Sequence, residues 1–287
     1  DLLAAKTPNR RAKKAENQRL RRAAKKAGVS LDGKDYDHKD SKFKTVKKNR
    51  GNDGKGTKKE GKKLLAVLID PEKMDLKHIP CFFEKIHNSI ATHIFVGGST
   101  DKDNQTESVV MAVKKETNLP IILFPGDVSQ ITNKADGILF LSLLSGRNPE
   151  YLIEQQIKAA PILKNAPLEI IPTGYILIDG KKETATQKVS NTKPISQEKT
   201  TRILHTSLAG EFSGKQLIYL EAGSGATQVV SQNIIEMVSN KITVPLIVGG
   251  GIHTKKQLED AFNAGADIVV IGTAFEKDES FLKVLRK

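Results

Sequence analysis

Short apolar runs alternate with amphipathic stretches from about residue 61 to the end of the chain. The amphipathic stretches predict helices over residues 76–90, 104–117, 149–164, 196–213, 227–240 and 254–264, with Ser196 and Thr254 as capping residues. The eight apolar runs are Leu64–Ile69, His93–Val96, Pro120–Phe124, Gly137–Leu141, Leu168–Ile171, Leu217–Leu220, Pro245–Val248 and Ile268–Ile271. They are apolar throughout, which is typical of strands buried on both faces of a parallel sheet. The pattern therefore predicts eight successive βα units.

Polar residues or glycines follow nearly every apolar run, at the position where the predicted strand ends. Examples are Asp70, Ser99, Glu221, residues 249–251 and Gly272. Barrel enzymes carry their chemistry on such loops from many strands, whereas an open doubly wound sheet concentrates it at one switch point. We therefore predict that residues 61–287 form one (β/α)₈ TIM barrel rather than an open sheet.

The first sixty residues differ in composition from the rest. They contain almost no aromatic or branched apolar residues, and residues 1–62 hold 21 Lys and Arg against 8 Asp and Glu. This excess equals the formal net charge of the whole chain, +13, so the predicted barrel is neutral. A segment with little apolar surface to bury is expected to stay disordered. Residues 1–60 are thus predicted to be a basic, disordered low-complexity tail and linker.

Composition also bears on the class of protein and its compartment. The single cysteine, Cys81, excludes an internal disulfide, and its apolar neighbours predict that it is buried. No apolar stretch approaches 18 residues, and the N-terminus lacks a secretory signal pattern. We therefore expect a cytoplasmic protein without a transmembrane helix. The six histidines are scattered, so we expect no histidine metal cluster.

The last two predicted strands carry the strongest functional signal. The segment 248–252 reads VGGGI, and the segment 271–274 reads IGTA. In barrels a phosphate often binds between the loops after the seventh and eighth strands, where glycines let backbone N–H groups approach its oxygens. We predict a phosphate site at Gly250, Gly251, Gly272 and Thr273; the alternative is that the glycines only form tight turns.

The sixth predicted strand ends in a carboxylate that precedes a flexible turn. The sequence there is Tyr219-Leu220-Glu221-Ala222-Gly223-Ser224-Gly225. A carboxylate beside a phosphate loop suits a general base that takes a proton from a substrate hydroxyl. The alternative is that Glu221 merely binds a loop amide, and position alone leaves both interpretations open.

The first two predicted strands end in hard oxygen ligands. Asp70 follows the first strand and Ser99 follows the second, so both belong to the same barrel mouth. Two oxygen ligands suit Mg²⁺, which keeps several waters and takes phosphate oxygens from its substrate. The alternative for Asp70 is a cap on the turn that begins at Pro71. Arg147, after the fourth strand, is a candidate either for a diphosphate contact or for a helix cap.

Taken together, these motifs resemble the geranylgeranylglyceryl phosphate synthase family. The matching segments include LLAVLIDPEK (64–73), HIFVGGST (93–100), LFLSLLSGRNPEYLI (139–153), KQLIYLEAGSGA (215–226), PLIVGGGI (245–252) and VVIGTAFE (269–276). They cover essentially all of residues 62–287 in order, and the YLEAGSGA form resembles the second subgroup, which occurs in some archaea and in Bacteroidetes-type bacteria.

The resemblance implies a Mg²⁺-dependent prenyltransferase that joins a prenyl diphosphate, here expected to be geranylgeranyl diphosphate, to the 3-hydroxyl of sn-glycerol 1-phosphate. By position, Asp70 and Ser99 become the metal ligands and Glu221 the catalytic residue. The glycerol phosphate site becomes Tyr219, Leu220, Glu221, Ala222, Gly223, Ser224, Gly225, Gly250, Gly251, Gly272 and Thr273. The resemblance also implies a homo-oligomer, either a dimer or a hexamer. We expect the prenyl groove near the second to fourth strands.

Two other functions remain as alternatives. One is another phosphate-binding barrel enzyme, such as a sugar-phosphate isomerase, which would share the glycine loops. The other is a binding role for the tail, whose charge is suited to an acidic membrane surface or to nucleic acid. The tail lacks interleaved aromatic residues for base stacking, so any nucleic-acid binding should be non-specific. Of the two partners, we expect peripheral membrane contact rather than nucleic acid.

Overall fold

The computed structural model describes residues 34–37, 42–45, 63–101 and 103–272. Contacts divide the chain into two compact units, residues 1–60 and residues 61–287. In the first unit, β1 (Lys34–Asp37) and β2 (Lys42–Thr45) pair as an antiparallel sheet in which Tyr36 stands opposite Phe43. The sequence did not predict this hairpin, and the rest of residues 1–60, for which disorder is expected, lies outside the described residues.

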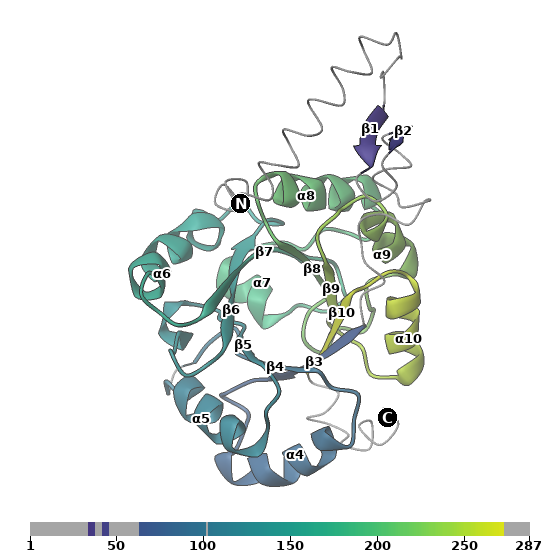
Figure 1. Ribbon diagram of the computed structural model, residues 1–287. Coiled ribbons are helices and arrows are strands. Elements are labelled where there is room, and N and C mark those ends of the chain that lie inside the picture. Colours follow the sequence, from purple (N-terminus) through teal and green to yellow (C-terminus); the bar gives the residue numbers. More distant parts are fainter. Residues whose placement is uncertain (1–33, 38–41, 46–62, 102, 273–287) are drawn as a thin grey trace. The chain divides into compact units, whose positions relative to one another are not determined.

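The second unit is a closed barrel of eight parallel strands (Figure 1). Each strand pairs with the next in sequence, and the last pairs with the first, so that Ile268 stands opposite Leu64. The predicted (β/α)₈ barrel is thus confirmed, and every predicted strand is present. The strands are β3 (Leu64–Ile69), β4 (His93–Val96), β5 (Ile121–Leu123), β6 (Gly137–Leu143), β7 (Glu169–Leu177), β8 (Leu217–Glu221), β9 (Leu246–Gly249) and β10 (Ile268–Ile271).

Helices surround the barrel where the sequence predicts them. They are α4 (Ile79–His87) preceded by the 3₁₀ turn η1 (Leu76–His78), α5 (Thr106–Glu116), α6 (Gln155–Leu163) preceded by the π-helical turn η3 (Glu150–Glu154), α8 (Thr200–Phe212), α9 (Gln232–Ser239) and α10 (Lys255–Asn263). Thr254 caps α10 through a capping box with Gln257, as predicted. The cap predicted at Ser196 is wrong, because α8 begins later, after Lys199.

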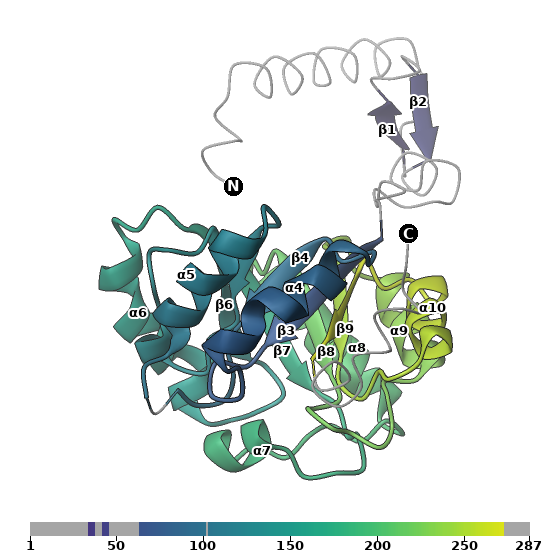
Figure 2. The same cartoon turned by 90° about the horizontal axis from the view of Figure 1, so that it is seen from below.

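Two elements depart from the simple alternation of strands and helices. After β5 the chain forms only the 3₁₀ turn η2 (Val128–Gln130), and an additional helix, α7 (Ala185–Ser190), follows β7. Figure 2 shows α7 apart from the ring of helices, at the end of the barrel where the strands finish. Neither feature was predicted, and both lie beside the site described below.

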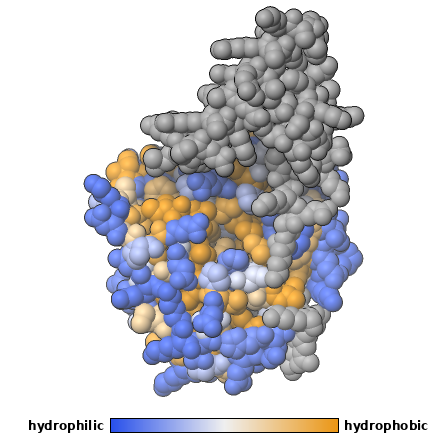
Figure 3. All heavy atoms as spheres, in the orientation of Figure 1, coloured by the Kyte–Doolittle hydropathy of each residue, from blue (hydrophilic) through white to orange (hydrophobic). Residues whose placement is uncertain are grey.

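The strands bury side chains on both faces, in agreement with their uniformly apolar sequences. Inside the barrel, Ala66, Phe95, Leu139, Tyr175 and Tyr219 belong to one apolar cluster, and a larger cluster lies between strands and helices. On the face seen in Figure 3, hydrophilic residues gather around the rim and apolar residues appear in the middle, where the strands lie. The barrel is therefore a packed core rather than a pore.

Two further features concern the surface. Cys81 is exposed, and the prediction of burial is wrong because α4 turns Ile79, Phe82, Phe83 and Ile86 toward the core instead. Within the described part of the chain, no helix is both long enough and apolar enough to cross a membrane.

Candidate active site

A pocket of about 500 Å³ lies at the ends of the barrel strands. It brings together most of the residues predicted for the site, although they come from strands far apart in sequence. The predicted residues that line it are Asp70, Ser99, Tyr219, Glu221, Gly223, Ser224, Gly225, Gly250, Gly251 and Gly272. Leu220 instead packs in the cluster outside the barrel, Ala222 is buried without lining the pocket, and Thr273 lies outside the described residues.

The glycine turns after β8 and β9 approach each other through their backbones. Gly223, Gly250 and Gly251 have φ angles of +100°, +85° and +73°, which L side chains rarely adopt. A Cβ atom at Gly250 would lie 2.4 Å from both the Gly223 nitrogen and the Oε1 atom of Glu221. Backbone conformation and lack of space therefore both require glycine here. As a result, no side chain of these residues stands between their backbone amides and the pocket.

Glu221 ends β8 between these turns and is buried, with 7% of its surface exposed. Its Oε1 atom accepts a hydrogen bond of 2.7 Å from the Gly223 amide. Burial raises the pKa of Glu221, and this effect outweighs the neighbouring Tyr219 hydroxyl and the Gly223 amide, which both lower it. Glu221 therefore binds a loop amide, as the alternative interpretation expects, and burial makes its carboxylate more basic than an exposed one.

The Tyr219 hydroxyl lies beside the other carboxylate oxygen of Glu221. A Cβ atom at Gly249 would lie 2.5 Å from this hydroxyl and 2.7 Å from Glu221 Oε2. The hydroxyl is fully buried and makes no hydrogen bond of standard geometry. Burial and the Glu221 charge raise the pKa of Tyr219 well above its usual value, so the phenol stays protonated. Its ring stacks on Phe124 at 5.4 Å between centroids, which fixes the floor of the pocket.

Asp70 and Ser99 border the pocket on the opposite side of the mouth. A Cβ atom at Gly98, the neighbour of Ser99, would lie 3.0 Å from Asp70 Oδ1, so the two loops touch at this point. Asp70 accepts a hydrogen bond of 3.2 Å from the Glu72 amide, as a turn cap would, and forms an ion pair of 2.7 Å with Lys73. Ser99 Oγ lies 3.2 Å from Thr186 Oγ1 of α7.

The donor set on this side fits Mg²⁺ better than a transition metal. A carboxylate and a hydroxyl are hard oxygen ligands, and Mg²⁺ completes its shell with water and substrate phosphate. In residues 63–101 and 103–272 no group of three or more His, Cys, Asp or Glu side chains is placed to hold a metal ion. Two protein ligands would leave the other positions of a Mg²⁺ shell to water or to phosphate oxygens of a substrate.

Several lining residues were not predicted from the sequence. Lys182, whose ammonium would lie 3.0 Å from a Cβ atom at Gly225, stands next to the glycine turn, and Thr184 and Thr186 come from the start of α7. The segment 179–190 follows β7 and carries no glycine-phosphate signature, so only the fold brings it to the pocket. Arg147 is not in this pocket; its guanidinium donates to the carbonyls of Leu144 and Gly146.

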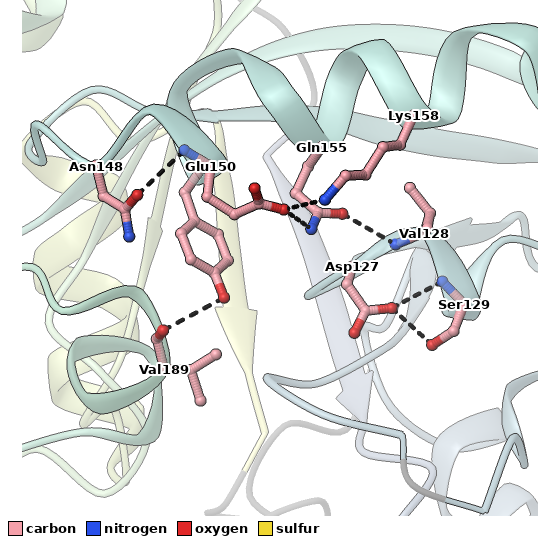
Figure 4. Close-up of polar contacts among 9 residues, drawn as sticks. Asp127, Val128, Ser129, Asn148, Glu150, Gln155, Lys158 and Val189 are labelled. Carbon is pink, nitrogen blue, oxygen red and sulfur yellow. Dashed lines mark hydrogen bonds and ion pairs between the residues drawn. The ribbon is translucent and has the colours of Figure 1, made fainter.

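The pocket extends past the barrel wall, along the outer face of β6 toward α6. This part is lined by Ile131, Ile138, Phe140 and Ala159, all apolar. Figure 4 shows its polar edge: Gln155 accepts from the Val128 amide at 3.2 Å and donates to Glu150 at 2.7 Å. Tyr151 donates to the Val189 carbonyl of α7 at 3.3 Å. An apolar groove thus opens from a polar site, because η2 replaces a full helix after β5.

A glutamate buried between two glycine turns, and an apolar groove beside them, define an enzyme built on a (β/α)₈ barrel. The chain belongs to the PcrB family, whose model matches residues 58–287. It is 60% identical over 221 residues to the geranylgeranylglyceryl phosphate synthase of Zunongwangia profunda, in an alignment that covers 77% of this chain and 94% of that protein. It is 41% identical over 228 residues to the Pyrococcus abyssi enzyme of the same name, with 79% and 90% covered.

Solved structures give the same result. The geranylgeranylglyceryl phosphate synthase from Thermoplasma acidophilum, solved in complex with its substrate sn-glycerol-1-phosphate, is 33% identical, with a TM-score of 0.74 over 79% of this chain and 91% of that one. The enzyme from Thermoplasma volcanium is 36% identical, with a TM-score of 0.73 over 78% and 90%.

Proposed function

We propose that this chain is a geranylgeranylglyceryl phosphate synthase that joins geranylgeranyl diphosphate to the 3-hydroxyl of sn-glycerol 1-phosphate. The observation that carries the proposal is the buried Glu221 carboxylate, which lies between two glycine turns at one end of an apolar groove. Two relatives, 41% and 60% identical to this chain in alignments that cover at least 90% of each relative, support the same reaction. The product is an ether-lipid precursor, and pyrophosphate leaves.

The glycerol phosphate is assigned to the glycine side of the pocket. Backbone amides of the turns at Gly225, Gly250 and Gly272 would bind the phosphate oxygens, and Lys182 would add a positive charge beside them. With the phosphate held there, the 3-hydroxyl points toward Glu221. This assignment is in keeping with the Thermoplasma acidophilum relative, which was solved with the same small molecule bound.

The diphosphate is assigned to the opposite side, at Asp70 and Ser99. These residues would hold Mg²⁺, which neutralises charge on the departing diphosphate. Lys73, paired with Asp70 at 2.7 Å, adds a second positive charge at this edge. Two phosphorylated substrates repel each other, so binding one through backbone amides and the other through a cation keeps both in one pocket.

The chemical step exchanges one carbon–oxygen bond for another. The 3-oxygen of the glycerol bonds to the first carbon of the prenyl group, while the bond from that carbon to the diphosphate oxygen breaks. Glu221 takes the proton from the hydroxyl, and pyrophosphate leaves with the electron pair of the broken bond. Tyr219, kept protonated by burial, stays next to Glu221 and limits access of water to the carboxylate.

The prenyl chain is assigned to the apolar groove between β6 and α6. Its lining by Ile131, Ile138, Phe140 and Ala159 is apolar, which suits a hydrocarbon. Gln156 of α6 also lines the pocket, and its side-chain amide is turned toward the Leu141 carbonyl of β6. The groove lies beside the third and fourth barrel strands, β5 and β6, and the prenyl groove is expected from the sequence near the second to fourth strands.

The protein is also proposed to form a homo-oligomer. Ile153 and Ile157 are 51% and 55% exposed and lie four residues apart, on one side of the π-helical turn and α6. Burying both in a subunit contact would contribute roughly 1.5–3 kcal/mol for each side chain.

The reaction is tested by incubating the protein with radiolabelled sn-glycerol 1-phosphate, geranylgeranyl diphosphate and Mg²⁺. A labelled prenyl ether is expected, and it should be sharply reduced in Asp70→Asn. No product with any prenyl diphosphate from C15 to C35, from a folded protein, would refute the proposal and would favour a sugar-phosphate isomerase or a related barrel enzyme.

A further inference from the structure

Gln130 links two loops of the pocket through its side-chain amide. It ends the 3₁₀ turn η2 and is 1% exposed. Its Oε1 atom accepts from the Gly126 amide at 2.9 Å and, more weakly, from the Gly98 amide at 3.5 Å. Its Nε2 atom donates to the Gly98 carbonyl at 3.2 Å. One side chain thus joins the loop after β4 to the loop after β5.

The two loops that Gln130 joins carry the diphosphate side of the site. Gly98 precedes Ser99, and a Cβ atom at Gly98 would lie 3.0 Å from Asp70 Oδ1. At Gly126, a Cβ atom would lie 2.5 Å from the Gly98 carbonyl oxygen and 2.7 Å from that of Ser99. The backbone at Gly98 is therefore packed between Asp70 and Gly126, and Gln130 fixes its orientation by hydrogen bonds on both sides of the residue.

The other end of this link is also held in place. Asp127 caps η2 by accepting from the Ser129 amide at 2.7 Å, and the Val128 amide donates to Gln155 of α6 at 3.2 Å (Figure 4). Gln130 therefore stands on a turn that is tied to α6. If the loops after β4 and β5 moved, η2 could move with them only by breaking its hydrogen bond to Gln155.

We propose that Gln130 is a positioning residue that sets Ser99 against Asp70 and thereby controls metal and diphosphate binding, without acting on the glycerol phosphate side. The inference rests on the proposed function for the identity of the ligands. Partners that orient the ligands of a metal typically change metal affinity by 10–100-fold when they are removed. Loss of Gln130 should therefore change metal affinity at Asp70 and Ser99 and leave the glycerol phosphate side of the pocket unchanged.

The barrel provides a matched control on its other side. Gln197 makes the same kind of link: its Nε2 atom donates to the Asp179 and Val229 carbonyls at 3.0 Å each, and its Oε1 atom accepts from the Ser231 amide at 3.0 Å. Gln130→Met and Gln197→Met each remove three hydrogen bonds to the backbone. The two variants should lose similar thermal stability, but only the first alters the loops at Asp70 and Ser99.

Two measurements separate a positioning role from a merely structural one. The first is Mn²⁺ binding in the presence of inorganic pyrophosphate, followed by electron paramagnetic resonance, and the second is the half-saturating Mg²⁺ concentration in turnover. Gln130→Met should weaken Mn²⁺ binding and raise the Mg²⁺ requirement about tenfold or more. Its KM for sn-glycerol 1-phosphate should stay within about twofold of the wild-type value. Gln197→Met should leave both metal readouts unchanged.

The proposal is overturned if folded Gln130→Met binds Mn²⁺ like the wild type, or if both variants change metal binding equally. If Gln130→Met does not fold, Gln130→Glu is the second test, because it keeps the acceptor for the two amides and replaces the donor to the Gly98 carbonyl by a carboxylate oxygen that repels it. Gln130→Glu should raise the Mg²⁺ requirement, and an unchanged requirement would overturn the proposal. If the wild type makes no prenyl ether but Gln130→Met alone loses Mn²⁺ binding, the positioning role of Gln130 stands and the proposed function is refuted.

Discussion

Replacing Glu221 by glutamine separates its chemical role from its structural one. Glutamine keeps the shape of the side chain and an oxygen that can accept from the Gly223 amide, which lies 2.7 Å from Oε1 of the glutamate. It cannot take a proton from the glycerol hydroxyl. A positioned general base contributes typically 10²–10⁴-fold to a rate. We therefore expect kcat to fall about 100- to 10,000-fold, or roughly 2.7–5.4 kcal/mol of transition-state stabilisation.

The pH dependence of stability provides an independent check on the same substitution. Burial raises the pKa of Glu221 above its usual value of about 4.5, so the folded state binds the proton more tightly than the unfolded state. Folding is then favoured most when the carboxyl is protonated, and wild-type stability falls as the pH rises from about 4.5 through the raised pKa. The glutamine side chain does not titrate in this way. The free energy of unfolding of Glu221→Gln, compared with that of the wild type at the same pH, should therefore be higher at pH 7 than at pH 4.

The assay combines steady-state kinetics with urea unfolding at pH 4 and pH 7. The expected result is a large loss of kcat, a KM for sn-glycerol 1-phosphate within a few-fold of wild type, and a gain of stability that grows with pH. A variant with near wild-type kcat would show that Glu221 only binds the loop amide. A stability difference independent of pH would contradict the buried, titrating carboxylate.

Four other perturbations test separate parts of the account. Gly250→Ala should destabilise the fold by more than about 1 kcal/mol in urea unfolding, because its φ is +85° and a Cβ would meet Glu221 and Gly223 at 2.4 Å; unchanged stability and KM would contradict the close approach. Asp70→Asn should raise the half-saturating Mg²⁺ concentration, and an unaltered concentration would show that Asp70 is not a ligand of the metal. Ile157→Asp should shift the mass measured by light scattering toward the monomer; an unchanged mass would exclude this face of α6 as the subunit contact. Deletion of residues 1–60 should abolish salt-sensitive retention on anionic vesicles, and equal retention would exclude the tail as the membrane-binding segment.

The sequence predicted the barrel well because its strands have an unambiguous pattern. Runs such as Leu64–Ile69 and Ile268–Ile271 are buried on both faces, and their observed bounds match the predicted ones. The residues after the strands also met at one mouth, since parallel strands in a closed barrel all finish at the same end. Asp70, Ser99 and Glu221 could therefore be grouped without coordinates.

The parts that were not predicted depend on packing between distant segments. Gln130 and Gln155 look like ordinary polar residues in sequence, and only the fold brings Gln130 to Gly98 and Gln155 to Val128. Helix α7 has only six residues, too few to show a helical period, although Thr184 and Gln187 form a capping box that could have marked its start. Cys81 was misplaced because its neighbours are apolar, whereas its own position on α4 faces outward.

The most direct test of the central claim follows the oxygen atom of the glycerol. The protein would be given sn-glycerol 1-phosphate with ¹⁸O in its 3-hydroxyl, together with geranylgeranyl diphosphate and Mg²⁺, and the products would be analysed by mass spectrometry. Attack by that hydroxyl on the prenyl carbon predicts that all of the label stays in the prenyl ether and none enters pyrophosphate. Label in pyrophosphate, or the absence of a prenyl ether, would contradict the proposed reaction.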